Sequence, residues 1–232
     1  MYGRQPGSQD ESKKRGSLCA AATSGVQPTV AKTVMISPDA ANPMHKQGGG
    51  VIPFAKHNGQ VQFLFQTVFS GRKTGYLIDF GGGSDAGEDC RATAIREFVE
   101  ETETLYFADS LTLARRSPEA VGRQATLVGE LFEQTLRKAP HWWCERASSN
   151  PLKPKQWRTF FIEFPYRDVS PLNHQWATDT SGRFKKRREL AWIGGDELLQ
   201  IYKAAPKRLW KRVRQLNDAP DVVAEIIRVI GD

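Results

Sequence analysis

The chain has 232 residues, 39% of them hydrophobic, and a formal net charge of +7 at pH 7. This length supports one sizeable core. No apolar run approaches the ~20 residues of a membrane span, so no membrane partner is expected. Cys19, Cys90 and Cys144 lie far apart without a CxxC pair, which disfavours a disulfide framework or a zinc site and predicts a cytoplasmic location. The positive charge is compatible with a polyanionic partner and equally with simple solubility.

The N-terminal part of the chain differs in composition from the rest. Residues 1–46 are rich in Ser, Gly, Ala, Pro and Gln and have no sustained periodicity, which predicts a flexible, disordered tail of open function. Residues 47–232 are predicted to form a single domain that ends in a C-terminal helical extension.

The first half of this domain predicts strands followed by a helix. Apolar stretches at 48–54 and 61–69 predict two strands, and Asn58-Gly59 between them is a strong hairpin signal. Residues 76–80 predict a short strand that runs into a turn of three glycines, Gly81 to Gly83. A helix is predicted from about residue 88 to 102.

The second half is less regular. Residues 126–136 fit a strand or a helix, and 138–156 predicts a loop with three prolines. Residues 157–166 predict a strand, and 170–188 a polar, basic connection. The final predicted elements are a strand, a turn and a capped helix within 189–202, and helical runs within 206–230. This mixture predicts an α/β or α+β fold in one domain.

Three glutamates, Glu97, Glu100 and Glu101, share one face of the predicted helix at 100° per residue. Like charges at these spacings cost a few tenths of a kcal/mol per pair, and no lysine follows one turn later. Either the face is simply solvated, or a hard divalent cation such as Mg²⁺ or Mn²⁺ binds between the carboxylates. The apolar residues of the helix lie roughly opposite and would pack on a sheet: Ala94, Ile95, Phe98 and Val99.

The spacing of the glycines and glutamates resembles the signature of the Nudix hydrolases, G-x5-E-x7-R-E-U-x-E-E-x-G-U, where U is a bulky apolar residue. The chain departs from it at the end, where Glu103 replaces the last glycine and Thr104 the last apolar residue. Glycine would ease the helix into a left-handed turn, so this departure concerns the following loop more than the chemistry. The matching positions are Gly82, Glu88, Arg96, Glu97, Phe98, Glu100 and Glu101.

The resemblance implies an α/β/α sandwich with a mixed sheet, and Mg²⁺- or Mn²⁺-dependent hydrolysis of a nucleoside diphosphate linked to another group. The implied metal ligands are Glu97 and Glu101, with Glu100 beside them. The carbonyl of Gly82 or of a neighbouring glycine such as Gly83 would complete the site and contact substrate.

The resemblance also implies roles for residues around these ligands. Arg96 would orient a carboxylate through a bidentate ion pair, and Glu88 would be structural. A strand with an E-x-x-W pattern is common in this family, and Glu189 and Trp192 fit it. Glu189 is the candidate general base, with Glu163 second.

The partner is predicted from basic segments. Arg72 and Lys73 are placed to meet substrate phosphates, whereas the basic stretches at 185–188 and 207–214 either bind RNA or form a solvated helix face. The main hypothesis is hydrolysis of a small nucleotide derivative. The alternatives are removal of a cap or 5′-pyrophosphate from RNA, and a catalytically inactive nucleotide- or RNA-binding module of the same fold. Assembly as a homodimer stays open.

Overall fold

The computed structural model describes residues 46–114, 116–146, 155–184 and 188–231. The predicted N-terminal tail lies outside the described residues except for Lys46, and so do three of the four residues of the basic stretch 185–188. Among the described residues, no helix is both long and apolar enough to cross a bilayer.

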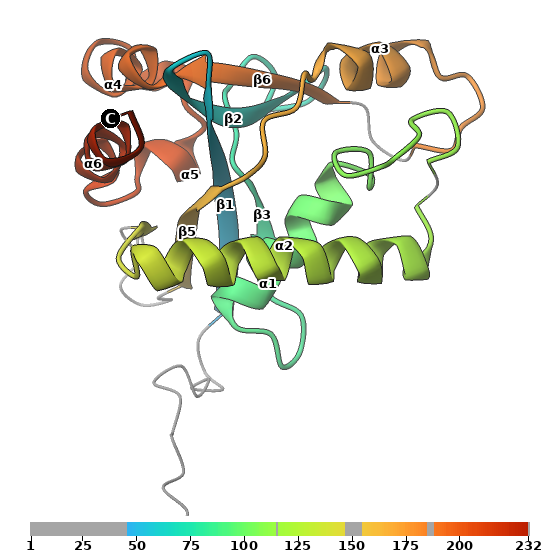
Figure 1. Ribbon diagram of the computed structural model, residues 1–232, viewed down its shortest axis with the longest axis horizontal. Coiled ribbons are helices and arrows are strands. Elements are labelled where there is room, and N and C mark those ends of the chain that lie inside the picture. Colours follow the sequence, from blue (N-terminus) through green and yellow to red (C-terminus); the bar gives the residue numbers. More distant parts are fainter. Residues whose placement is uncertain (1–45, 115, 147–154, 185–187, 232) are drawn as a thin grey trace, which may run out of the picture. The chain divides into compact units, whose positions relative to one another are not determined.

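A six-stranded mixed sheet forms the centre of the described residues (Figure 1). The strand order is β4-β5-β1-β2-β6, and β3 pairs with β1. The pairing of β1 with β5 is parallel, and the other pairings are antiparallel. The strands are β1 (Lys46–His57), β2 (Gln60–Val68), β3 (Phe80–Gly83), β4 (Trp143–Glu145), β5 (Lys155–Glu163) and β6 (Arg188–Gly194).

Helices cover both faces of this sheet, because each face buries its own hydrophobic cluster. On one face, Leu64 and Phe80 pack with Phe98 of α1, and on the other, Phe63 packs in a cluster with Val213 of α5. Figure 1 shows α1 lying alongside α2, with α4, α5 and α6 gathered together elsewhere. The predicted α/β/α sandwich with a mixed sheet is therefore confirmed. The helices are α1 (Cys90–Glu101), α2 (Pro118–Lys138), α3 (Ser170–Thr178), α4 (Gly195–Ala204), α5 (Lys211–Arg214) and α6 (Ala219–Gly231), with a 3-10 turn η1 (Pro206–Arg208).

The hairpin between β1 and β2 is confirmed. Asn58 and Gly59 have φ angles of 50° and 75°, the left-handed conformation that a tight two-residue turn requires. Residues 126–136, which fitted a strand or a helix, belong to helix α2. This helix begins at Pro118, where the Ser117 side chain caps it by accepting a hydrogen bond from the Ala120 amide.

Three predictions about the connections were wrong. Gly81 to Gly83 belong to strand β3 and form no turn. The predicted loop 138–156 contains β4 and the first residues of β5. The predicted connection 170–188 contains α3, whose Leu172 and Trp176 are fully buried four residues apart. Apolar contacts with the rest of the core stabilise these short elements, and their local sequences carry little signal.

Candidate functional site

Two glycine triplets far apart in the sequence are paired across the sheet. Gly48, Gly49 and Gly50 of β1 lie opposite Gly83, Gly82 and Gly81 of β3. A Cβ on Gly49 would lie 1.8 Å from the Cys90 carbonyl oxygen, and one on Gly82 would lie 2.0 Å from a Glu97 carboxylate oxygen. The missing side chains therefore let α1 approach the sheet closely enough for Glu97 to lie directly against backbone.

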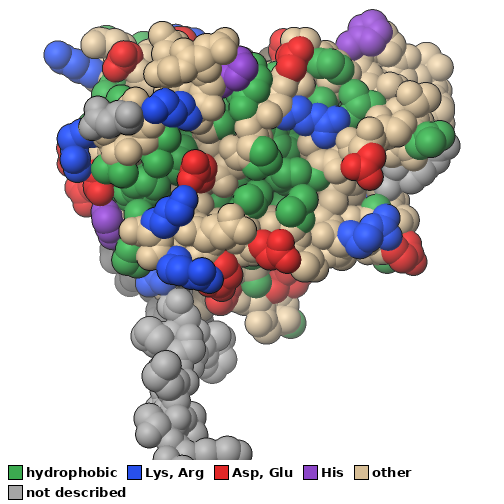
Figure 2. Space-filling model, viewed as in Figure 1, with side chains coloured by type: hydrophobic (Ala, Val, Ile, Leu, Met, Phe, Trp, Pro, Cys, Tyr) green, Lys and Arg blue, Asp and Glu red, His purple; other side chains and the backbone are tan. Residues whose placement is uncertain are grey.

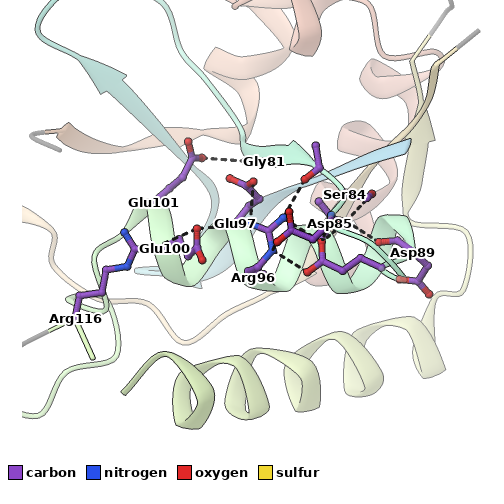
Figure 3. A network of polar contacts seen from close by, with 12 residues as sticks. Gly81, Ser84, Asp85, Asp89, Arg96, Glu97, Glu100, Glu101 and Arg116 are labelled. Carbon is purple, nitrogen blue, oxygen red and sulfur yellow. Dashed lines mark hydrogen bonds and ion pairs between the residues drawn. The ribbon is translucent and has the colours of Figure 1, made fainter. Parts of the chain in front are cut away.

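Local contacts fix the rotation of α1 on the sheet. The Asp89 carboxylate accepts a hydrogen bond of 2.7 Å from the Ala92 amide and caps the first turn. Phe98 packs edge-to-face against Phe80 of β3, with ring centroids 4.9 Å apart. With Phe98 held in the core, Glu97 and Glu101, one turn apart, both lie on the side of α1 that faces β3 (Figure 3).

Glu101 is buried and bonded to three separate segments. Its Oε2 accepts hydrogen bonds from Gln66 Nε2 at 2.6 Å and from the Gly81 amide at 2.9 Å. Its Oε1 pairs with Arg188 Nη2 at 3.0 Å, and Arg188 also donates to Gln66. Of the two alternatives for the acidic face, simple solvation is therefore excluded for Glu101, which is only 7% exposed.

Arg96 connects the glycine segment to two carboxylates. Its Nε and Nη2 donate to the two oxygens of Glu88 at 2.7 and 3.0 Å, which makes a bidentate pair. Nη1 donates to Glu97 at 3.1 Å, and Nη2 donates to the Gly83 carbonyl at 3.0 Å. The Glu88 carboxylate also accepts from the Asp85 amide. Arg96 thus fixes Glu97 against the glycine strand and directs four hydrogen bonds to groups within the protein.

The pKa values of these groups follow from their surroundings. Burial, and then the negative charge of Glu101, raises the pKa of Glu97 in spite of its contact with Arg96. The hydrogen bond from Arg96 lowers the pKa of Glu88, and the reciprocal bond raises that of Arg96. The protein therefore compensates the negative charge of Glu97 only in part.

Glu100 lies beside this pair and is more exposed. Its Oε2 is 3.5 Å from Arg96 Nη1 and 3.3 Å from Arg116 Nη2, which approaches from the segment before α2 (Figure 3). Within the described ranges, no three acidic, His or Cys side chains converge as a metal site. Magnesium at phosphate sites commonly uses one or two carboxylates, with water and substrate phosphates completing its shell. Glu97 and Glu101, with the adjacent glycine backbone, fit that requirement.

Neither candidate general base is brought to the carboxylates. Side chains alternate along β6, so Arg188 faces Glu101 whereas Glu189 is exposed on the opposite face of the sheet, the face covered by α4 and α6. Glu163 pairs with Phe54 in the β1–β5 register, away from the glycine segment of β1, and lies 3.6 Å from Lys138. The structure therefore places Glu189 and Glu163 away from the other predicted site residues.

Arg72 and Lys73 line a pocket of about 360 Å³ together with residues of the C-terminal basic stretch, Trp210, Lys211 and Arg212. Arg212 is buried and pairs with Asp79 at 2.6 Å, so the prediction of a solvated helix face is wrong at this position. Elsewhere charge is mixed: on the face in Figure 2, basic and acidic side chains are interspersed.

The two positions that depart from the signature have an unusual backbone. Glu103 and Thr104 both have positive φ angles, 50° and 62°. This is the left-handed conformation for which glycine is suited, at a cost of roughly 1–2 kcal/mol for other residues. The chain therefore retains the left-handed turn after α1 without the glycine, and both residues are buried there.

Sequence reasoning missed Gln66, and it named Gly81 and Arg188 only as parts of a glycine turn and a basic stretch, without their contacts to Glu101. Arg188 ended a run of basic residues that predicted surface exposure, and Gln66 lay within an apolar strand with no distinguishing pattern. Their contacts with Glu101 span 35, 20 and 87 residues of sequence. No periodicity within one segment could have indicated them.

No protein-family model matches the chain, and no curated protein matches it. Among solved structures, the chain is similar to an Ap4A hydrolase of C. elegans, with 13% identity, a TM-score of 0.42, and coverage of 80% of this chain and 97% of that one. It is also similar to the Nudix hydrolase RenU of M. smegmatis, with 14% identity, a TM-score of 0.39, and coverage of 81% and 89%. At this level of similarity the activities of those proteins do not transfer to this chain.

Proposed function

We propose that the protein is a Nudix-type hydrolase that uses Mg²⁺ or Mn²⁺ to cleave a pyrophosphate bond in a nucleotide derivative. The observation that carries this proposal is the pairing of Glu97 and Glu101 against the glycine strand β3, with Arg96 clamping Glu97 at 3.1 Å. The same residues hold the signature spacing, so pattern and geometry support one chemistry.

Glu97 and Glu101 would hold the metal. The Gly82 carbonyl predicted as a ligand faces β1 in the sheet, whereas the Gly81 carbonyl lies on the side of Glu101 and would complete the site instead. The ion, when bound, neutralises the phosphates and lowers the pKa of a bound water. The raised pKa of Glu97 supports this assignment, because a cation would relieve the repulsion between Glu97 and Glu101. Gln66, Arg188 and the Gly81 amide would keep Glu101 in place.

Glu100 is the best-placed proton acceptor of the three glutamates. Its side chain is 32% exposed, compared with 17% for Glu97 and 9% for Glu101, so water reaches it most easily. Arg96 and Arg116 would orient it. Glu189 is no longer the preferred general base, because it lies on the other face of the sheet.

One observation favours the inactive binding module as second candidate. Arg188 already pairs with Glu101, so the protein itself neutralises part of the negative charge that a metal ion would otherwise neutralise. A module of this kind would bind a nucleotide with Glu101 kept as a structural residue. The remaining alternative, removal of a cap or 5′-pyrophosphate from RNA, would use the same residues and the same reaction as the main proposal and would differ from it only in the substrate.

The test is phosphate-containing product release from a panel of substrates with Mg²⁺ or Mn²⁺ and with EDTA. The panel comprises dinucleoside polyphosphates, sugar nucleotides, NADH, normal and oxidised nucleoside triphosphates, and capped RNA. Glu97→Gln should abolish metal-dependent turnover while remaining folded, and Glu163→Gln is the matched control. Turnover that survives in Glu97→Gln, or in EDTA, would contradict the proposal. Nucleotide binding without turnover on any member would support the inactive module.

A further inference from the structure

The pocket lined by Arg72, Lys73, Arg146, Lys211 and Arg212, here called the Trp210 pocket, joins four segments, one of which is β5 with Trp157. Arg72 and Lys73 come from the loop before β3, Arg146 follows β4, and Trp210 to Arg212 begin α5. Trp157 and Trp210 supply its aromatic walls. Among the described residues that line it, five are basic and none is acidic.

The positive charge of this pocket is poorly compensated. Arg212 is neutralised by Asp79, to which its Nε also donates at 2.8 Å. Among the described residues, Arg146 donates to a neutral amide oxygen, Gln215 Oε1, at 2.8 and 3.1 Å. Burial and the charge of Arg212 lower the pKa of both Lys73 and Arg146. Four further cations thus line the pocket beside Arg212, and a bound anion would relieve the repulsion that Arg212 exerts on Lys73 and Arg146.

The two tryptophans differ in what they offer a ligand. Trp157 is buried, and the Arg212 guanidinium lies over its ring at 4.2 Å, so it forms the floor of the pocket. Trp210 is half-buried, and Tyr76 contacts it edge-on with ring centroids 5.4 Å apart. That contact holds the indole in place, and Lys73 Nζ lies over the same ring, 5.7 Å from its centroid, so a base would stack on Trp210 beside this ammonium group. A rigid, accessible indole beside cations can stack a nucleobase whose phosphates bind those cations.

The pocket is connected to the acidic site by direct contacts. The Asp79 carbonyl oxygen accepts from Gln66 Nε2 at 3.1 Å, and the same nitrogen donates to Glu101. Lys73 is influenced by the charges of Arg212 and Asp79 and also by that of Glu101. Asp79 and Gln66 thus join the pocket to Glu101 through the sheet.

We propose that the Trp210 pocket binds a nucleoside polyphosphate, with its base on Trp210 and its phosphates on Arg72, Lys73 and Lys211. This assignment rests on the proposed function for its role as the substrate subsite. Binding itself does not require hydrolysis, and the site is separate from the metal ligands.

The experiment is calorimetric titration of the full chain with ATP in EDTA, where no divalent metal bridges ATP to Glu97 and Glu101. The double variant Arg72→Ala/Lys211→Ala removes two exposed cations from the pocket and should weaken ATP binding at least about tenfold. The control variant Lys207→Ala/Arg214→Ala removes equal charge from the same C-terminal stretch outside the pocket, and should bind ATP within about twofold of wild type. An equal loss in both variants would overturn the proposal in favour of unspecific charge attraction.

The nucleobase is tested with tripolyphosphate and Trp210→Leu. Trp210→Leu should weaken binding of ATP and leave binding of tripolyphosphate unchanged, and an equal effect on both ligands would overturn the nucleotide assignment. Tighter binding of a 5′-hydroxyl oligoribonucleotide than of ATP would instead identify an RNA site. Specific ATP binding combined with no turnover of any substrate in the panel would refute the proposed function while supporting this inference. Metal-dependent turnover without specific ATP binding in this pocket would support the proposed function and overturn this inference.

Discussion

Replacing Arg212 by Met should destabilise the protein strongly, because it leaves the Asp79 carboxylate buried without its counter-charge. Asp79 is fully buried and Arg212 nearly so, and the guanidinium reaches Asp79 Oδ1 at 2.6 and 2.8 Å. Two unit charges about 4 Å apart interact by about 4 kcal/mol at an effective dielectric constant of 20. Of the described groups, the Thr159 hydroxyl would remain bonded to the carboxylate, at 3.2 Å. We expect a loss of roughly 3–5 kcal/mol in the free energy of unfolding.

Urea unfolding followed by far-UV circular dichroism measures this loss. Arg214→Met, an exposed arginine two residues away, is the matched control and should change stability by less than about 0.5 kcal/mol. The double variant Asp79→Leu/Arg212→Met removes both charges and should recover much of the lost stability. A cost below about 1 kcal/mol for Arg212→Met would refute the reasoning, because it would mean that water screens the pair.

Three further predictions concern the acidic site. In EDTA, Glu97→Gln should stabilise the protein relative to wild type as the pH rises above about 4.5, because deprotonation of a carboxyl whose pKa is raised by folding destabilises the folded state. Urea unfolding across pH 4 to 8 measures the difference between the two proteins, and a difference that does not change with pH would contradict this prediction. Arg96→Lys should lower kcat about 10- to 100-fold with little change in KM, since lysine cannot make the bidentate contact with Glu88 and hold Glu97 at once; steady-state kinetics decide, and wild-type kcat would exclude a positioning role. Glu189→Gln should leave kcat within about twofold of wild type, and a large loss would restore Glu189 as the general base.

The sequence by itself determined the features that depend on neighbouring residues. The i, i+3 and i+4 spacing of Glu97, Glu100 and Glu101 followed from helical periodicity, and so did the burial of Phe98. The Asn58-Gly59 turn followed from backbone conformations that those two residues adopt at low cost. These predictions succeeded because their physical causes act within a few residues.

Only the tertiary structure decided which charges compensate one another. Arg188 and Arg212 belonged to stretches whose composition predicted surface exposure, yet each pairs with a buried carboxylate, 87 and 133 residues away respectively. The pairing of the two glycine triplets was equally hidden, because glycine carries no side-chain pattern that indicates its partner strand. Strand register and buried ion pairs depend on contacts between distant segments, and such contacts are fixed only when the whole sheet assembles.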